Sequence, residues 1–252
     1  MNSFKDPSSS TQTEAIAPPT RRLIAPAWHA AALIAVLLLI SVASAGSQAE
    51  YANQHGRMNI YLLTMGWEWL LLLYVVWGLR RMRVPLREIM GEKWKGPLDA
   101  LLDAAIAAAF WLLSAFVLAG MAYLLGLAKE QNIQAAREQI SFLFPHSGVE
   151  ILVWALLSAT AGFCEEIIFR GYLQKQLASI TGATWIGIVG QAAVFGGSHM
   201  YEGIQRVIII AVWGIMFGVL AHFRRSLRPG MMAHGFHDFF TGLAGRVLLG
   251  GQ

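Results

Sequence analysis

Three short clusters of ionisable residues lie within or beside strongly apolar runs in the second half of the chain. Their sequences read Glu165-Glu166-x-x-x-Arg170, Phe195-x-x-x-His199 and His234-x-x-x-Asp238. An ionisable side chain in an apolar, bilayer-spanning run costs free energy unless it is paired or faces a water-filled cavity, so each cluster is a candidate functional site. Carboxylates and imidazoles are also the groups that most often move protons in hydrolytic reactions.

The spacing of the first cluster separates its two glutamates by role. Glu166 and Arg170 stand at positions i and i+4 of a helix, with the acid towards the N-terminus, which favours an ion pair. Glu165 is rotated by about 100° from Glu166 on a helix of 3.6 residues per turn, so it is free to face the bundle interior. There it can hold a water molecule and accept its proton, and we expect His199 to bind the same water.

The third cluster is compatible with two chemistries. His234 and Asp238 are again i and i+4 and face one groove, where a carboxylate that accepts from an imidazole N–H fixes the tautomer. Alternatively, the pair stabilises the oxyanion of a tetrahedral intermediate. A glutamate and two histidines also match a catalytic zinc site, so Glu165, His199 and His234 are the predicted ligands if a divalent metal such as zinc is bound.

The remaining polar residues of the apolar runs have structural interpretations. Any one cluster alone is explained by polar contacts between transmembrane helices, and the site hypothesis depends on the three occurring together. Glu68, between Trp67 and Trp69, is interpreted as a carboxylate at headgroup level or as a packing partner. The same structural reading covers the acids at the start of one run, two histidines and the single cysteine: Asp99, Asp103, His222, His237 and Cys164.

The elements that must position these residues are transmembrane helices. The chain has 252 residues, of which 56% are hydrophobic and 13% charged, about half the charged fraction of a soluble domain. The apolar runs carry no polar face, and about 20 residues cross the hydrocarbon core. We therefore predict an all-α polytopic bundle of about seven helices, at residues 27–45, 60–79, 101–127, 149–169, 185–195, 204–221 and 231–249.

Two of these runs leave alternatives open. The run 27–45 ends in Ala43-Ser44-Ala45, which resembles the cleavage site of a signal peptide, although we favour a first transmembrane helix. The run that begins at Val149 either ends near Phe169 or continues to about Ile180. Only the longer helix, or a re-entrant segment at Trp185, brings Glu165 and His199 to one depth, and we favour the longer helix.

The distribution of charge predicts orientation and partners. Arginines and lysines crowd two connections, at residues 80–95 and 224–228, which a seven-helix alternation places on the same side as Arg21 and Arg22. By the positive-inside rule that side is cytoplasmic. We expect an integral protein of the plasma (inner) membrane, with a disordered cytoplasmic tail at 1–25, about three helices in 26–148 and a catalytic core in 149–250. We attribute the net charge of +4 to basic residues beside the bilayer, and we expect no nucleic-acid partner.

The order and spacing of the three clusters resemble the signature of the CPBP family. This family comprises the type II CAAX prenyl endopeptidases and bacterial relatives linked to bacteriocin processing and self-immunity. The resemblance covers about residues 149–249. It implies that Glu165 and His199 activate the attacking water, that His234 and Asp238 steady the oxyanion, and that Glu166 and Arg170 support them. The CAAX-processing members carry Asn where this chain has Asp238, so we expect Asp238 to orient His234 instead of binding the oxyanion.

The resemblance implies an intramembrane endopeptidase that cleaves a membrane-associated or C-terminally lipidated protein or peptide. The family's glutamate mechanism requires no metal, and we favour it over the metallo-type. A non-catalytic immunity or scaffold protein of the same fold, or a small transporter that uses the buried Glu and His groups, are the alternatives. The sequence indicates no particular oligomeric state and names no substrate.

Overall fold

The computed structural model describes residues 22–45, 47–127, 129, 131 and 141–249, and this part of the chain contains helices and no strand. The predicted tail at 1–25, except for its last four residues, lies outside the described residues. So does Arg21.

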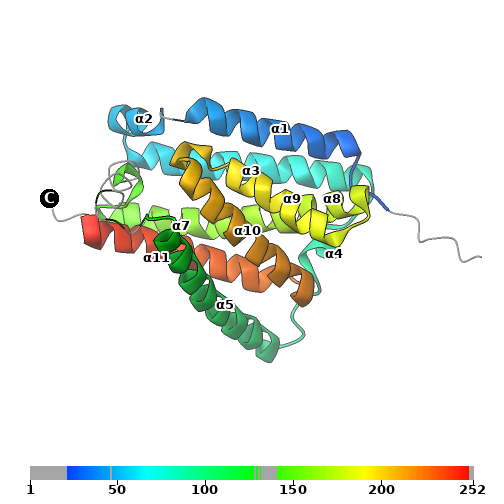
Figure 1. Ribbon diagram of the computed structural model, residues 1–252. Coiled ribbons are helices and arrows are strands. Elements are labelled where there is room, and N and C mark those ends of the chain that lie inside the picture. The colour runs from blue at the N-terminus through cyan, green and yellow to red at the C-terminus, as the bar shows by residue number, and fades with distance from the viewer. Residues whose placement is uncertain (1–21, 46, 128, 130, 132–140, 250–252) are drawn as a thin grey trace, which may run out of the picture.

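The helices form a single elongated bundle (Figure 1). The N-terminal half contains α1 (Ala27–Ser44), α2 (Gln48–His55), α3 (Arg57–Arg81), α4 (Leu86–Met90) and α5 (Pro97–Leu124). The C-terminal half contains η1 (Ser141–Leu143), α7 (Gly148–Glu165), η2 (Glu166–Leu173), α8 (Gln174–Thr181), α9 (Thr184–Gly197), η3 (Met200–Glu202), α10 (Ile204–Arg224) and α11 (Arg228–Leu249).

All seven predicted spans appear as helices, which confirms the polytopic all-α bundle. Five are long and apolar enough to cross a membrane: α1, α3, α5, the continuous helix Gly148–Thr181, and α10. The other two are α9, an apolar helix of 14 residues, and α11, which has 22 residues and carries the His234 cluster. The protein is therefore an integral, multi-pass membrane protein.

The helix that carries the glutamate pair takes the longer of its two predicted forms. It begins at a capping box formed by Ser147 and Glu150 and continues through η2 to Thr181. Its 34 residues span about 50 Å, more than the hydrocarbon core of a bilayer. Segment η2 is a π-helix, a form that is frequent at functional sites, and it begins at Glu166. Glu165 therefore lies near the middle of the helix.

The short helix α9 returns the chain to the depth of Glu165. From Glu165 to the end of α8 at Thr181 the helix extends about 24 Å, and from Thr184 along α9 to His199 the chain returns about 22 Å. These matched lengths place His199 opposite Glu165. The re-entrant interpretation of the Trp185 run is not needed for the two residues to meet.

Glycines at two contacts let the helices of the site approach closely. A Cβ atom on Gly162, one turn before Glu166, would lie 2.7 Å from Gly235 N and from Met231 O of α11. A Cβ atom on Gly196 of α9 would lie 2.5 Å from Val207 O of α10. Small residues at such contacts allow transmembrane helices to pack backbone to backbone. The α7–α11 contact brings the glutamates of η2 and α7 beside His234.

Helix α1 packs as an integral part of the bundle. Buried Gln176 accepts from the backbone N–H groups of Ile24 and Ala25 just before α1, at 3.0 and 3.1 Å. Within α1, His29 Nδ1 lies 2.7 Å from the Tyr172 hydroxyl. These buried contacts favour the transmembrane-helix interpretation of α1 over a cleaved signal peptide.

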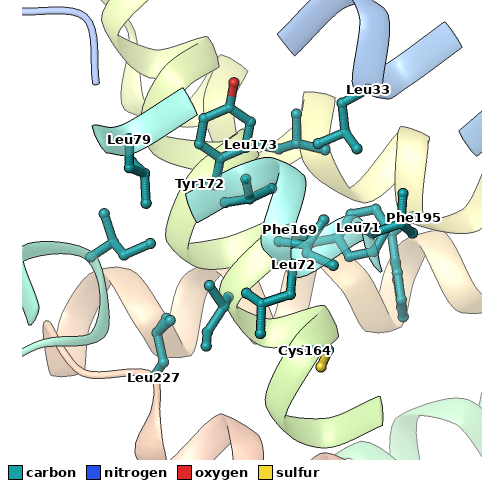
Figure 2. Close-up of a cluster of buried hydrophobic side chains, with 14 of the residues drawn as sticks. Leu33, Leu71, Leu72, Leu79, Cys164, Phe169, Tyr172, Leu173, Phe195 and Leu227 are labelled. Atoms are coloured by element: carbon teal, nitrogen blue, oxygen red, sulfur yellow. The ribbon is translucent and has the colours of Figure 1, made fainter. Parts of the chain in front are cut away.

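The hydrophobic core lies where α1, α3, η2 and α9 meet, as Figure 2 shows. All four elements contribute members to it, among them Leu33, Leu71, Leu72, Leu79, Phe169, Tyr172, Leu173 and Phe195. Phe169 and Phe195 pack edge to face, with ring centroids 4.9 Å apart. The core therefore fixes η2 against α9 beside the polar clusters.

Candidate active site

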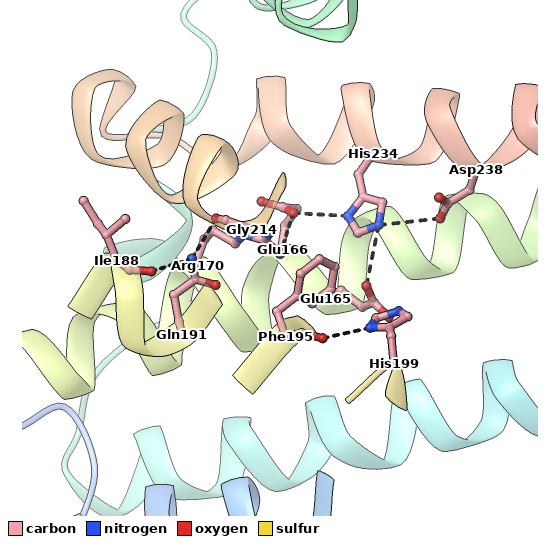
Figure 3. A network of polar contacts seen from close by, with 10 residues as sticks. All are labelled: Glu165, Glu166, Arg170, Ile188, Gln191, Phe195, His199, Gly214, His234 and Asp238. Carbon is pink, nitrogen blue, oxygen red and sulfur yellow. Dashed lines mark hydrogen bonds and ion pairs between the residues drawn. The ribbon is translucent and has the colours of Figure 1, made fainter. Parts of the chain in front are cut away.

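The four residues predicted to do chemistry line one cavity inside the bundle. Glu165 is the last residue of α7, His199 follows α9, and His234 and Asp238 lie on α11 (Figure 3). The cavity has a volume of about 1360 Å³. Most of its other lining is apolar, from α1, α3, α5 and α10, so a polar group inside it interacts in a medium of low dielectric constant.

His234 lies at the centre of the polar cluster, and only 2% of it is exposed. Its Nδ1 atom is 3.1 Å from Glu166 Oε1. Its Nε2 atom is 3.5 Å from Glu165 Oε2 and 3.6 Å from Asp238 Oδ2. Both ring nitrogens therefore face carboxyl groups, and Nε2 faces the cavity.

These distances differ from the prediction of which carboxylate orients the His234 imidazole. Spacing led us to expect that Asp238 holds the imidazole, yet Glu166 makes the shorter contact, and makes it to the other nitrogen. The side chain of Asp238 remains 28% exposed in the cavity. Because a carboxylate that accepts from one ring nitrogen fixes the ring, Glu166 is the residue that orients His234.

The ion pair predicted between Glu166 and Arg170 is present and fully buried. Arg170 Nη1 lies 3.1 Å from Glu166 Oε1, and the two side chains are at most 1% exposed. The guanidinium N–H groups have no well-aligned hydrogen bond among the described residues. Instead the guanidinium carbon lies 4.3 Å from the centre of the Phe195 ring and 5.0 Å from that of Phe217. The attraction is therefore Coulombic and cation–π in character.

The contacts of His199 settle its tautomer. Its Nδ1 atom is 2.8 Å from the backbone oxygen of Phe195. A carbonyl oxygen can only accept, so Nδ1 carries a proton, and in the neutral ring Nε2 therefore has the lone pair. His199 thus offers a hydrogen-bond acceptor to a water or substrate in the cavity.

Several residues interpreted as structural also line this cavity. Glu68 of α3 is 6% exposed and lies in the cavity wall near the middle of its helix, a place that the structural interpretation did not predict. His237 lines the cavity as well, with its ring 4.6 Å from that of Trp213. Helical periodicity gave no signal for either residue, because the rotation of α3 and α11 relative to their neighbours decides which face meets the cavity.

Tyr201 is a further cavity residue that sequence reasoning missed. It lies in η3, outside the spans, with its ring 5.8 Å from that of His199. Withdrawal from water, followed by the charge of Glu202, raises the pKa of its phenol well above the ordinary value. The phenol therefore keeps its proton at neutral pH and is a hydrogen-bond donor beside His199.

Other polar residues keep the structural roles expected of them. Cys164 is fully buried in the core. Asp103 forms an ion pair with Arg224 at 2.6 Å and accepts from the Trp94 indole, and thereby attaches the start of α5 to the end of α10. His222 is exposed at the end of α10.

The predicted metal ligands do not form a metal site in this arrangement. In the described part of the chain, no group of three or more His, Cys, Asp and Glu side chains is placed to hold a metal ion. Nδ1 of His199, which faces the backbone carbonyl of Phe195, is also unavailable for ligation. We therefore derive no step through a metal.

Comparison with protein families identifies the segment that contains these clusters. Residues 147–240 match the family described as type II CAAX prenyl endopeptidase Rce1-like. This segment belongs to the CPBP family. The match begins at the cap of α7 and ends just after Asp238, so it includes the four predicted catalytic residues. No curated protein and no solved structure matched the chain. At the level of the family, the match of this segment supports a protease of the intramembrane type.

Proposed function

We propose that this CPBP protein is an endopeptidase that hydrolyses a peptide bond of a membrane-associated or C-terminally lipidated protein inside the cavity. The observation that carries the proposal is the convergence of Glu165, His199, His234 and Asp238, from three separate helical segments, on one cavity within the span of the bundle. Four ionisable side chains in an apolar bundle cost free energy, and a reaction that needs them explains their presence.

The proposed reaction begins with a water held between Glu165 and the free Nε2 of His199. Glu165 takes a proton from the water as its oxygen attacks the scissile carbonyl carbon. The carbon–nitrogen bond of the tetrahedral intermediate then breaks while Glu165 delivers that proton to the leaving nitrogen. The products are a carboxylic acid and an amine, and one water is consumed.

The oxyanion of the intermediate forms opposite the attacking water. His234 presents Nε2 to the cavity while Glu166 holds Nδ1, so an imidazolium at this position donates to the oxyanion. Asp238 lies 3.6 Å from the same Nε2 and, as a carboxylate, is an acceptor. In this mechanism Asp238 sets the direction of the Nε2–H group of His234 and does not contact the oxyanion. No metal cofactor takes part.

The geometry of the cavity also suggests the side from which the substrate enters. The exposed residues of α2, such as Glu50 and Gln54, line its outer part. Helix α2 lies at the end of the bundle opposite α4 and α8 (Figure 1). Among the described residues, none from the basic connections at 80–95 and 224–228 lines the cavity. With the basic end cytoplasmic and the protein in the plasma membrane, as we propose, the cavity opens on the outer side.

The test compares membrane proteomes of cells with the intact protein and with Glu165→Ala. We expect fragments with new C-termini in cells with the intact protein and their absence in the variant, while the variant remains folded and present at the same level. Glu88→Ala, on α4 outside the cavity, is the matched control and should give the wild-type fragments.

Identical fragment patterns in all three strains would refute the proposal. A phenotype that survives Glu165→Ala would indicate a scaffold, and lost flux without altered fragments would indicate a transporter.

A further inference from the structure

Glu68 is a buried carboxyl group for which the described residues provide no hydrogen-bond partner. It is the twelfth of the 25 residues of α3, and only 6% of it is exposed. Its Oε2 atom is enclosed and has no hydrogen-bond partner among the described residues. The charged groups that act on it are other carboxyls, those of Glu165 and Asp238. An enclosed carboxyl oxygen without a donor is costly, so stability alone does not explain this residue.

The side chain of Glu68 faces the candidate active site. It lines the same cavity as Glu165, His199 and His234. Thr64 and Leu71, one turn away on either side along α3, line the cavity too, so this face of α3 forms its wall. Helix α7 packs against both α3 and α11, so Glu68 and His234 reach the cavity from different helices. What the cavity binds can supply the hydrogen-bond donor that the described residues do not.

We propose that Glu68 accepts a hydrogen bond from a backbone N–H of the bound substrate, next to the scissile bond, and so positions the peptide; this inference rests on the proposed function. An extended peptide that enters an apolar cavity loses water from its N–H groups, and each then needs an acceptor. A carboxyl oxygen on the wall supplied by α3 provides one, while His234 faces the carbonyl oxygen from α11. Glu68 is thus a positioning residue that fixes the depth at which the substrate binds.

The experiment uses the purified full-length protein in detergent and a quenched fluorogenic peptide built on a cleavage sequence mapped in the proteome comparison. We expect Glu68→Leu to lower kcat/KM about tenfold, as the loss of one buried hydrogen bond implies, mainly by raising KM. Glu68→Gln retains an acceptor oxygen and should stay near the wild type. Glu68→Leu should also unfold at a higher temperature, because it removes an unpartnered carboxyl from an apolar wall, whereas the loss of a structural residue would lower that temperature.

A series of peptides N-methylated at single positions near the scissile bond identifies the donor. One such methylation should lower kcat/KM of the wild-type protein about tenfold. It should leave kcat/KM of Glu68→Leu unchanged, because that variant already lacks the same hydrogen bond. Glu88→Leu, on the exposed surface of α4 outside the cavity, is the control and should behave as the wild type does throughout.

Three results would overturn the inference. In the first, Glu68→Leu cleaves the peptide as fast as the wild type. In the second, methylation and Glu68→Leu lower kcat/KM independently. In the third, Glu68→Gln is as impaired as Glu68→Leu, and only for peptides with Lys or Arg, which would assign Glu68 to a side-chain cation instead. If the wild type and Glu165→Ala release the same products, the proposed function fails as well; in the other cases it stands.

Discussion

Replacement of Arg170 by methionine tests whether the buried ion pair holds the active-site helix together. Methionine keeps most of the length of the side chain and its packing, but removes the charge. Loss of one partner from a buried ion pair costs about 3–5 kcal/mol, because the other charge remains in a medium of low dielectric constant. Glu166 keeps its contact with His234 at 3.1 Å, which offsets part of that cost. The lost contacts with the rings of Phe195 and Phe217 act in the opposite direction.

We therefore expect Arg170→Met to lower the free energy of unfolding by about 3 kcal/mol. The chain provides a matched control in Arg206, which pairs with Glu202 at the same i,i+4 spacing. That distance is 3.2 Å, but the two side chains are 25% and 18% exposed. Because water screens such a pair, Arg206→Met should cost no more than about 1 kcal/mol.

The assay is reversible unfolding in mixed micelles, followed by the fluorescence of the nine tryptophans. The double variant Glu166→Gln, Arg170→Met removes both charges and should recover most of the loss, with a coupling of about 2 kcal/mol or more in the double-mutant cycle. If Arg170→Met costs no more than Arg206→Met, burial does not control the strength of this pair, and the reasoning is wrong.

Three further predictions concern other parts of the site. Asp238→Asn should retain substantial activity, since Glu166 and not Asp238 holds the imidazole; complete loss in the cleavage assay would contradict this. Gly162→Val should separate α7 from α11 and lower both stability and activity, whereas Gly120→Val, with open space around its Cβ position, should be tolerated in a thermal unfolding assay. Because the single native cysteine is buried, Gln54→Cys and Lys93→Cys can be labelled selectively in whole cells with a membrane-impermeant maleimide. Gln54→Cys should react at once and Lys93→Cys only after permeabilisation, and the reverse pattern would refute the proposed side of entry.

The relation between the three polar clusters was only partly accessible from sequence. The ion pair of Glu166 and Arg170 follows from i,i+4 spacing within one helix, and it is present at 3.1 Å. The partner of His234 does not follow in the same way. Its i+4 neighbour Asp238 lies 3.6 Å away, while Glu166 on another helix lies closer. A contact between helices depends on their relative rotation and depth, and neither quantity is encoded in local spacing.

Sequence by itself determined the membrane-embedded all-α fold, the approximate limits of seven helices and the three clusters of ionisable residues. These are local properties, since the length of an apolar run and the period of a helix do not depend on what packs against them. Tertiary structure alone decided that Glu68 lies in the cavity wall, that the backbone of Phe195 sets the tautomer of His199, and that the cavity extends towards α2. The physical reason is that the helices meet at contacts such as Gly162 against Gly235, and the rotation chosen there selects which face of each helix the cavity receives.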